Sequence, residues 1–390
     1  MKMSLRAAAA GCVVGLLLVS PAAADYRAAY RAYTAAMEAG DYAAAEREAE
    51  NAWRLAETEL GDNPNTAVLA VNYAQLVAES APAKAAEAYE RALALAEKGV
   101  SDLDPDDLKL RARLARFYAA PAGKGEAEAE ALAAALAAYR AAGGPPSHES
   151  AHASLRLATD AAAKGGDRNL EKAASLADAA AADARALDRA DTRLLREALT
   201  IAGVARTARR ERKAEDIAEA VLLLDEAISL YPPQRAIDAF DPELGYVLAW
   251  RAAVGAVANS LGGAPRVSTG TRIPEGENLK LALEQAARRS PYSDSGVKWA
   301  QPHPETCEIN WEKREPAEYP RIKLRSGDIG SAVIGYDLEG TRVVRAVILG
   351  EVGDFGEASR KAALAWTLAE PVAPECARNL ITNFAFVIVS

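Results

Sequence analysis

Alanine and leucine recur at three- and four-residue spacing from Tyr26 to about Leu261. This spacing places apolar side chains on one face of an α-helix. Turn residues interrupt the pattern at Gly40-Asp41, Asn63-Pro64, Asp104-Pro105 and Gly143-Gly144-Pro145-Pro146. The pattern therefore predicts a series of helices separated by short turns, and we assign residues 25–261 to one all-α domain.

The prolines of this region give the series a period. Pro64, Pro105 and Pro146 are 41 residues apart, and each opens a helical run, where a missing N–H costs nothing. Second helices open near Asp41, Pro82 and Gly125. One helical hairpin cannot bury its apolar stripe alone, so we expect stacked hairpins with a broad surface for partners. The units resemble tetratricopeptide-type repeats of longer period, with packing positions at Gly40, Tyr42, Ala88 and Ala92.

The pattern changes after Leu261. Residues 262–314 are rich in Gly, Pro and Ser, which is typical of a linker, and include a short helix at about Asn278 to Arg289. Strand patterns follow over Ser331–Leu338 and Thr341–Leu349, and Glu339-Gly340 between them is a tight-hairpin signal. A helix over Asp354–Leu368 and a last strand over Leu380–Val389 complete a ββαβ domain at 315–390. The predicted class is α+β overall.

The first 24 residues read as a targeting segment. Lys2 and Arg6 precede an apolar run from Ala7 to Val19, and small residues follow Pro21. This order is typical of a cleaved signal peptide and predicts export to the periplasm or cell envelope, with Asp25 as the new N-terminus. The alternative is a retained inner-membrane anchor, in which residues 7–24 would associate with the membrane.

Composition narrows the function classes. The net charge of −9 and the pI of about 5.2 disfavour nucleic-acid binding, because phosphate backbones are repelled. Cys12 leaves with the signal, so Cys307 and Cys376 remain and could form a disulfide in an oxidising compartment. The alternative is two free thiols.

One motif has the form of a catalytic site. His148-Glu149-Ser150-Ala151-His152 is an H-E-x-x-H sequence, in which two histidines four residues apart on a helix could bind zinc. Glu171 lies where some zinc peptidases have a third ligand. However, no strand or large apolar frame accompanies this helix, and we interpret both histidines as solvated. We assign no metal, no cofactor and no catalytic residue, and we keep a zinc metallopeptidase as the last alternative.

The C-terminal residues carry a more specific pattern. It consists of Tyr319-Pro320, Gly327, Gly330, Val333, Tyr336, Asp337, Gly340, Gly353, Ala362-Ala363, Trp366 and Pro371. In combination this pattern resembles the C-terminal domain of TonB-type energy transducers. The resemblance implies a domain whose last strand binds extended peptides of outer-membrane receptors by strand addition. The residues along this strand are Asn379, Ile381, Asn383, Ala385, Val387 and Val389.

These features together predict an exported, non-enzymatic adaptor protein. Its partners are expected to be proteins, such as TonB-dependent receptors or other envelope proteins, and its role is expected to be linked to TonB-type transmembrane transport. An inner-membrane-anchored energy transducer is the first alternative. The alternative for the C-terminal domain is that its edge strand binds no peptide, because the linker at 300–318 covers the edge of the sheet.

Overall fold

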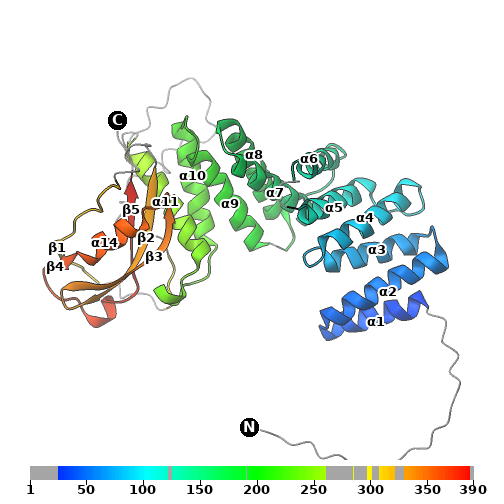
Figure 1. Ribbon diagram of the computed structural model, residues 1–390, viewed down its shortest axis with the longest axis horizontal. Coiled ribbons are helices and arrows are strands. Elements are labelled where there is room, and N and C mark those ends of the chain that lie inside the picture. Colours follow the sequence, from blue (N-terminus) through cyan, green and yellow to red (C-terminus); the bar gives the residue numbers. More distant parts are fainter. Residues whose placement is uncertain are drawn as a thin grey trace, which may run out of the picture. The chain divides into compact units, whose positions relative to one another are not determined.

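The computed structural model describes residues 25–121, 125–189, 191–260, 284, 297–300, 307–320 and 329–386. The predicted signal segment lies outside these residues, as does nearly all of the predicted linker helix. The described chain is mostly helical and ends in a small antiparallel sheet (Figure 1). This confirms the coarse prediction of helical repeats followed by a small sheet domain.

The helices begin where local chemistry supplies their first turns. They span Tyr26–Ala39 (α1), Tyr42–Leu60 (α2), Pro64–Val77 (α3), Pro82–Glu97 (α4), Pro105–Ala119 (α5), Gly125–Ala141 (α6), His148–Lys164 (α7), Asp167–Ala186 (α8), Thr192–Thr207 (α9), Ala214–Ser229 (α10) and Pro242–Ser260 (α11). Proline is the first residue of α3, α4 and α5, as the sequence predicted, whereas α7 begins at His148, two residues after Pro146, because Ser147 is its N-cap. At several helix starts the side-chain oxygen of the N-cap residue accepts a hydrogen bond from a free backbone N–H; these residues are Asp25, Asp41, Asn63, Asp104, Ser147 and Asp191.

The chain divides into two compact units, Met1–Glu128 and Ala129–Ser390. In the first unit, alanines without exposed surface allow the helices to approach closely, and Ala88 and Ala92 are among them, as predicted. Trp53 and Tyr73 stack in this core with ring centroids 5.5 Å apart. Tyr42, by contrast, is 68% exposed, so its predicted packing role is wrong.

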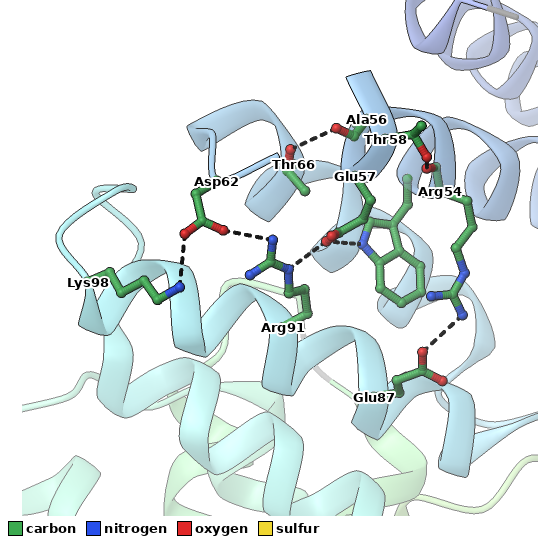
Figure 2. Close-up of polar contacts among 10 residues, drawn as sticks. Arg54, Ala56, Glu57, Thr58, Asp62, Thr66, Glu87, Arg91 and Lys98 are labelled. Carbon is green, nitrogen blue, oxygen red and sulfur yellow. Dashed lines mark hydrogen bonds and ion pairs between the residues drawn. The ribbon is translucent and has the colours of Figure 1, made fainter. Parts of the chain in front are cut away.

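Charged side chains join α2 to α4 across the first unit (Figure 2). The Arg91 guanidinium donates to Glu57 at 2.6 Å and to Asp62 at 3.0 Å, and the Lys98 ammonium donates to Asp62 at 2.9 Å. These hydrogen bonds hold the pKa of Asp62 below its ordinary value, with the Lys98 bond as the largest cause. Single exposed ion pairs contribute little to stability unless several charges form a network. Here Arg91 and Asp62 each have two partners and so connect the pairs into one network.

The sheet forms the C-terminal part of the second unit. Its strands are Trp311–Lys313 (β1), Gly330–Glu339 (β2), Arg342–Val352 (β3), Thr367–Leu368 (β4) and Leu380–Phe386 (β5), in the antiparallel order β1-β4-β3-β2-β5. Short helical elements at Ile237–Ala239 (η1), Gly356–Leu364 (α14) and Pro374–Cys376 (η2) complete the unit. Glu339 pairs with Arg342 across the turn, and Gly340 there has a positive φ of 57°, which confirms the predicted hairpin.

Both faces of the sheet are covered, by α14 on one side and by α11 on the other (Figure 1). Ala332, Ile334 and Phe384 pack with the α14 side, whereas Val333 and Leu349 belong to the core that α11 shares with the other helices. The interior strand β2, which lies between β3 and β5, is therefore buried along nearly its whole length. The Ser331 hydroxyl also donates a hydrogen bond to the Ala249 carbonyl of α11.

The observed domain boundaries differ from the predicted ones. The sequence placed a linker at 262–314 between separate domains, but helices α7–α11 and the sheet lie in one compact unit. Residues 311–313, within the predicted linker, form strand β1. The predicted helix 354–368 is shorter, because α14 ends at Leu364, and its buried residues are Gly356, Ser359 and Ala363.

Candidate functional site

The residues of the predicted TonB-like pattern form the interior of the sheet domain. The Trp366 side chain is 1% exposed, and its indole N–H donates to the Glu315 carbonyl at 2.8 Å. Tyr319 packs edge-on against Phe355 and Phe386 at centroid distances of 5.3 and 5.6 Å. These contacts place the Tyr319 ring in the core on the α14 side of the sheet.

The glycines and the aspartate of the pattern also have roles in packing and backbone geometry. A side chain at Gly330 would overlap the Phe355 ring, and Gly340 supplies the positive φ of the β2–β3 turn. Asp337 is buried, and its carboxylate accepts from the Asn379 backbone N–H at 2.9 Å. Pro320 follows Tyr319 at the end of the described segment 307–320, whereas Gly327 lies outside the described residues.

Strand β5 lies at one edge of the sheet, where the sequence placed the peptide-binding strand. Its recorded pairing is with β2 alone, from Leu380 opposite Tyr336 to Phe386 opposite Gly330. In an antiparallel edge strand, alternate backbone N–H and C=O groups point away from the paired neighbour. Among the described residues, no second strand pairs with β5.

The predicted side chains of this strand do not point along its open edge. Ile381 packs with the α11 core, and alternation places Asn383 and Ala385 on that same face. Asn379 has a left-handed φ of 54°, and its side-chain oxygen accepts from the Ile237 N–H at 3.1 Å. It thus ties η1 to the sheet. Val387 and Val389 lie outside the described residues.

The two remaining cysteines lie close together. Cys307 and Cys376 form a disulfide with Cα atoms 5.7 Å apart, across a sequence separation of 69 residues. The bond connects the residues just before β1 to η2, the turn that leads into β5. This arrangement is the geometry that the predicted disulfide requires.

A second cluster lies among the helices of the same unit. His148, His152 and Asp191 each offer a ligand atom, and these atoms lie within 4.8 Å of one another. Nε2 of His148 is 2.9 Å from Oδ2 of Asp191. Burial, followed by repulsion from His148, lowers the pKa of His152 to about 4. His152 is therefore neutral at neutral pH, with a lone pair on one ring nitrogen.

The third residue of this cluster differs from the one that the sequence suggested. The Ser150 hydroxyl donates to Asp183 at 2.8 Å, so the start of α7 lies against the end of α8. Glu171 is in the first turns of α8, about 18 Å away from Asp183 along the helix axis. The structure brings Asp191, the N-cap residue of α9, to the histidines instead. An Asp before a helical run signals an N-cap in the sequence, but it does not reveal which helix lies beside it.

A hollow of about 470 Å³ lies among α7, α9 and α11. Arg156, Glu197 and Tyr246 are among its lining residues. His152 and Arg156 are four residues apart on α7 and so share a face. The histidine cluster therefore lies one helical turn from the rim of this hollow.

Within the residues that the structure describes, no helix combines the length and apolar character needed to cross a membrane. No protein-family model matches the chain, and the search of curated proteins also gave no match. Among solved structures, BtubC (BKLC) from P. vanneervenii is similar over 54% of this chain and 93% of its own, with 19% identity and a TM-score of 0.37. At that TM-score the likeness carries no argument about fold or function.

Proposed function

We propose that the protein is a non-enzymatic adaptor of the cell envelope, whose C-terminal sheet binds extended peptides of partner proteins along β5. The observation that carries this proposal is the position of β5 at the sheet edge, with β2 as its recorded partner. In this proposal the helical part is a tetratricopeptide-like scaffold for a second partner, and the sheet domain is TonB-like. The partners are receptor or envelope proteins linked to TonB-type transport.

The chemistry of β5 supports strand addition. Soluble proteins usually blunt an exposed edge with lysine, proline or a bulge. The seven residues of β5, LITNFAF, contain neither lysine nor proline, and their pairing with β2 runs without a register shift. Within the described residues, an edge strand of seven residues in regular register offers enough backbone groups for a peptide of similar length.

Side chains of β5 pack on both faces of the sheet. Phe384 and Phe386 are anchored in the α14-side core, and Ile381 packs with the α11 core. Since these side chains are already engaged, the backbone of β5 would supply most of the affinity. We therefore expect broad sequence tolerance, in which the peptide is selected by its ability to form a strand.

Hydrogen exchange on the whole chain from Asp25 onward tests this proposal. The probe is a synthetic peptide that copies the N-terminal segment of a TonB-dependent receptor. We expect roughly every second amide of Leu380–Phe386 to exchange more slowly when the peptide is bound, because only the outward-pointing N–H groups gain a partner.

Two controls sharpen the measurement. A peptide with proline at every second position cannot donate the required hydrogen bonds and should give no protection. Strand β1 lies at the opposite edge of the sheet, so its amides should stay unchanged. Protection at β1, or equal protection by both peptides, would contradict strand addition at β5.

A second measurement distinguishes the exported adaptor from the alternative, an anchored energy transducer. The intact mass and N-terminal residue of the protein from fractionated cells decide between the two. Asp25 at the N-terminus supports the exported adaptor. Retention of Met1 in the membrane fraction favours the transducer.

A further inference from the structure

Two helices that are not consecutive bring three metal-binding side chains together. His148 is the first residue of α7, and His152 follows one turn later, with ring centroids 4.4 Å apart. Asp191 precedes the first residue of α9 and caps that helix. The cluster belongs to neither the sheet edge nor the disulfide.

We propose that His148, His152 and Asp191 bind one divalent transition-metal ion, with Zn²⁺ as the expected ion, and so link α7 to the N-terminus of α9. Imidazole nitrogen and carboxylate oxygen are ordinary zinc ligands, and two histidines with one carboxylate form a recurrent ligand set. This inference is independent of the peptide-binding proposal, because it concerns other elements of the chain.

The distances fit such a site after small side-chain rotations. Ligands about 2.1 Å from a tetrahedral zinc ion lie roughly 3.4 Å from one another. Here the His148 and Asp191 atoms are 2.9 Å apart, and the whole set lies within 4.8 Å. The hydrogen bond between His148 and Asp191 would be replaced by two bonds to the metal.

The carboxylate is already oriented for this role. Oδ1 of Asp191 accepts the Leu194 backbone N–H at 3.0 Å as part of the N-cap. Its other oxygen, Oδ2, is the one that faces His148. A ligand fixed by a hydrogen bond of this kind loses little freedom when a metal binds.

The surroundings indicate how the coordination would be completed. Three protein ligands leave at least one position open, and the His148 side chain is 51% exposed, so solvent reaches the cluster. We therefore expect water or hydroxide to occupy the open position.

Zinc competition against a chromophoric chelator tests the site, with untagged chain from Asp25 onward under non-reducing conditions. Keeping the Cys307–Cys376 disulfide intact prevents the thiols from binding zinc. We expect one zinc ion per chain. Asp191→Asn should weaken binding at least about 100-fold, because loss of a direct ligand costs more than the 10–100-fold typical of outer-shell residues. Asparagine still caps a helix, so α9 should persist.

Matched variants make the result specific to these three residues. His152→Gln should also lose at least about 100-fold in affinity, whereas Glu171→Gln should bind zinc as the unchanged protein does. The midpoint of thermal unfolding should rise with added zinc in the unchanged protein and in Glu171→Gln, but not in Asp191→Asn. Zinc binding weaker than about 100 µM in the unchanged protein, or unchanged affinity in both ligand variants, would overturn the proposal.

Discussion

The contact between α11 and β3 makes one substitution unusually informative. Gly245 of α11 and Gly350 of β3 meet backbone to backbone, so a Cβ at Gly245 would overlap the Leu349 carbonyl. Gly245 is in an ordinary helix, where alanine normally stabilises by about 1 kcal/mol relative to glycine. The two effects of Gly245→Ala therefore have opposite signs.

The packing effect should exceed the helix-propensity effect. Overpacking costs about 1–3 kcal/mol even where side chains can shift, and here both obstructing groups are backbone. Moving the sheet away would also expose part of Val333 and Leu349, at about 1.5–3 kcal/mol for each side chain fully lost from the core. We therefore expect Gly245→Ala to lower the free energy of unfolding by about 2–4 kcal/mol.

Urea denaturation measures this effect, and two further variants locate it. Gly203→Ala, in α9, meets mainly the Leu224 side chain, with the Ala220 carbonyl oxygen at 3.3 Å, and should cost less than Gly245→Ala. Gly350→Ala should cost as much as Gly245→Ala, and the double variant should cost less than their sum, because the sheet has already moved. If Gly245→Ala is neutral or stabilising, the sheet does not dock on α11 as described.

Two other predictions follow from the sheet domain. Replacing Cys307 and Cys376 together by serine should lower the free energy of unfolding by up to about 4 kcal/mol, because the bridge closes a loop with a sequence separation of 69. Dithiothreitol should destabilise the unchanged protein similarly and leave the double variant unaffected. Burial raises the pKa of Tyr336 to about 12, so its contribution is complete below pH 10 and is lost as the pH rises from 10 to 12. Because burial raises the pKa of Tyr231 as well, the test is a difference between two proteins: urea denaturation should show that Tyr336→Phe reduces the loss of unfolding free energy between pH 9 and pH 11 by about 1.4 kcal/mol.

The helical part of the fold could be predicted because its signals are local. Pro64, Pro82 and Pro105 fix helix starts through their own backbone geometry, and no distant residue is needed to interpret them. The β2–β3 hairpin is local in the same sense. The docking of α11 on the sheet is not, because nothing in the neighbours of Gly245 or Gly350 indicates that these residues meet.

The candidate metal site likewise combines a local sequence signal with a contact that depends on helix packing. A helical turn separates His148 from His152, so the sequence alone pairs them. The third position depends on how α7, α8 and α9 pack. A spacing rule pointed to Glu171, but the antiparallel course of α8 carries that residue away from the histidines. Asp191 reaches them because the next helix begins beside the start of α7.

The packing of α11 on one face of the sheet also affects how the chain folds during synthesis. Helix α11 carries apolar side chains such as Leu248 and Val254 that belong to the core shared with β2 and β3. A chain that emerges from its N-terminus completes α11 well before β5, which ends more than 120 residues later. At about 5–20 residues per second, the sheet-facing side of α11 stays uncovered for roughly 10 s. Interception by a chaperone, or association between unfinished chains, is therefore expected in this interval and on this face.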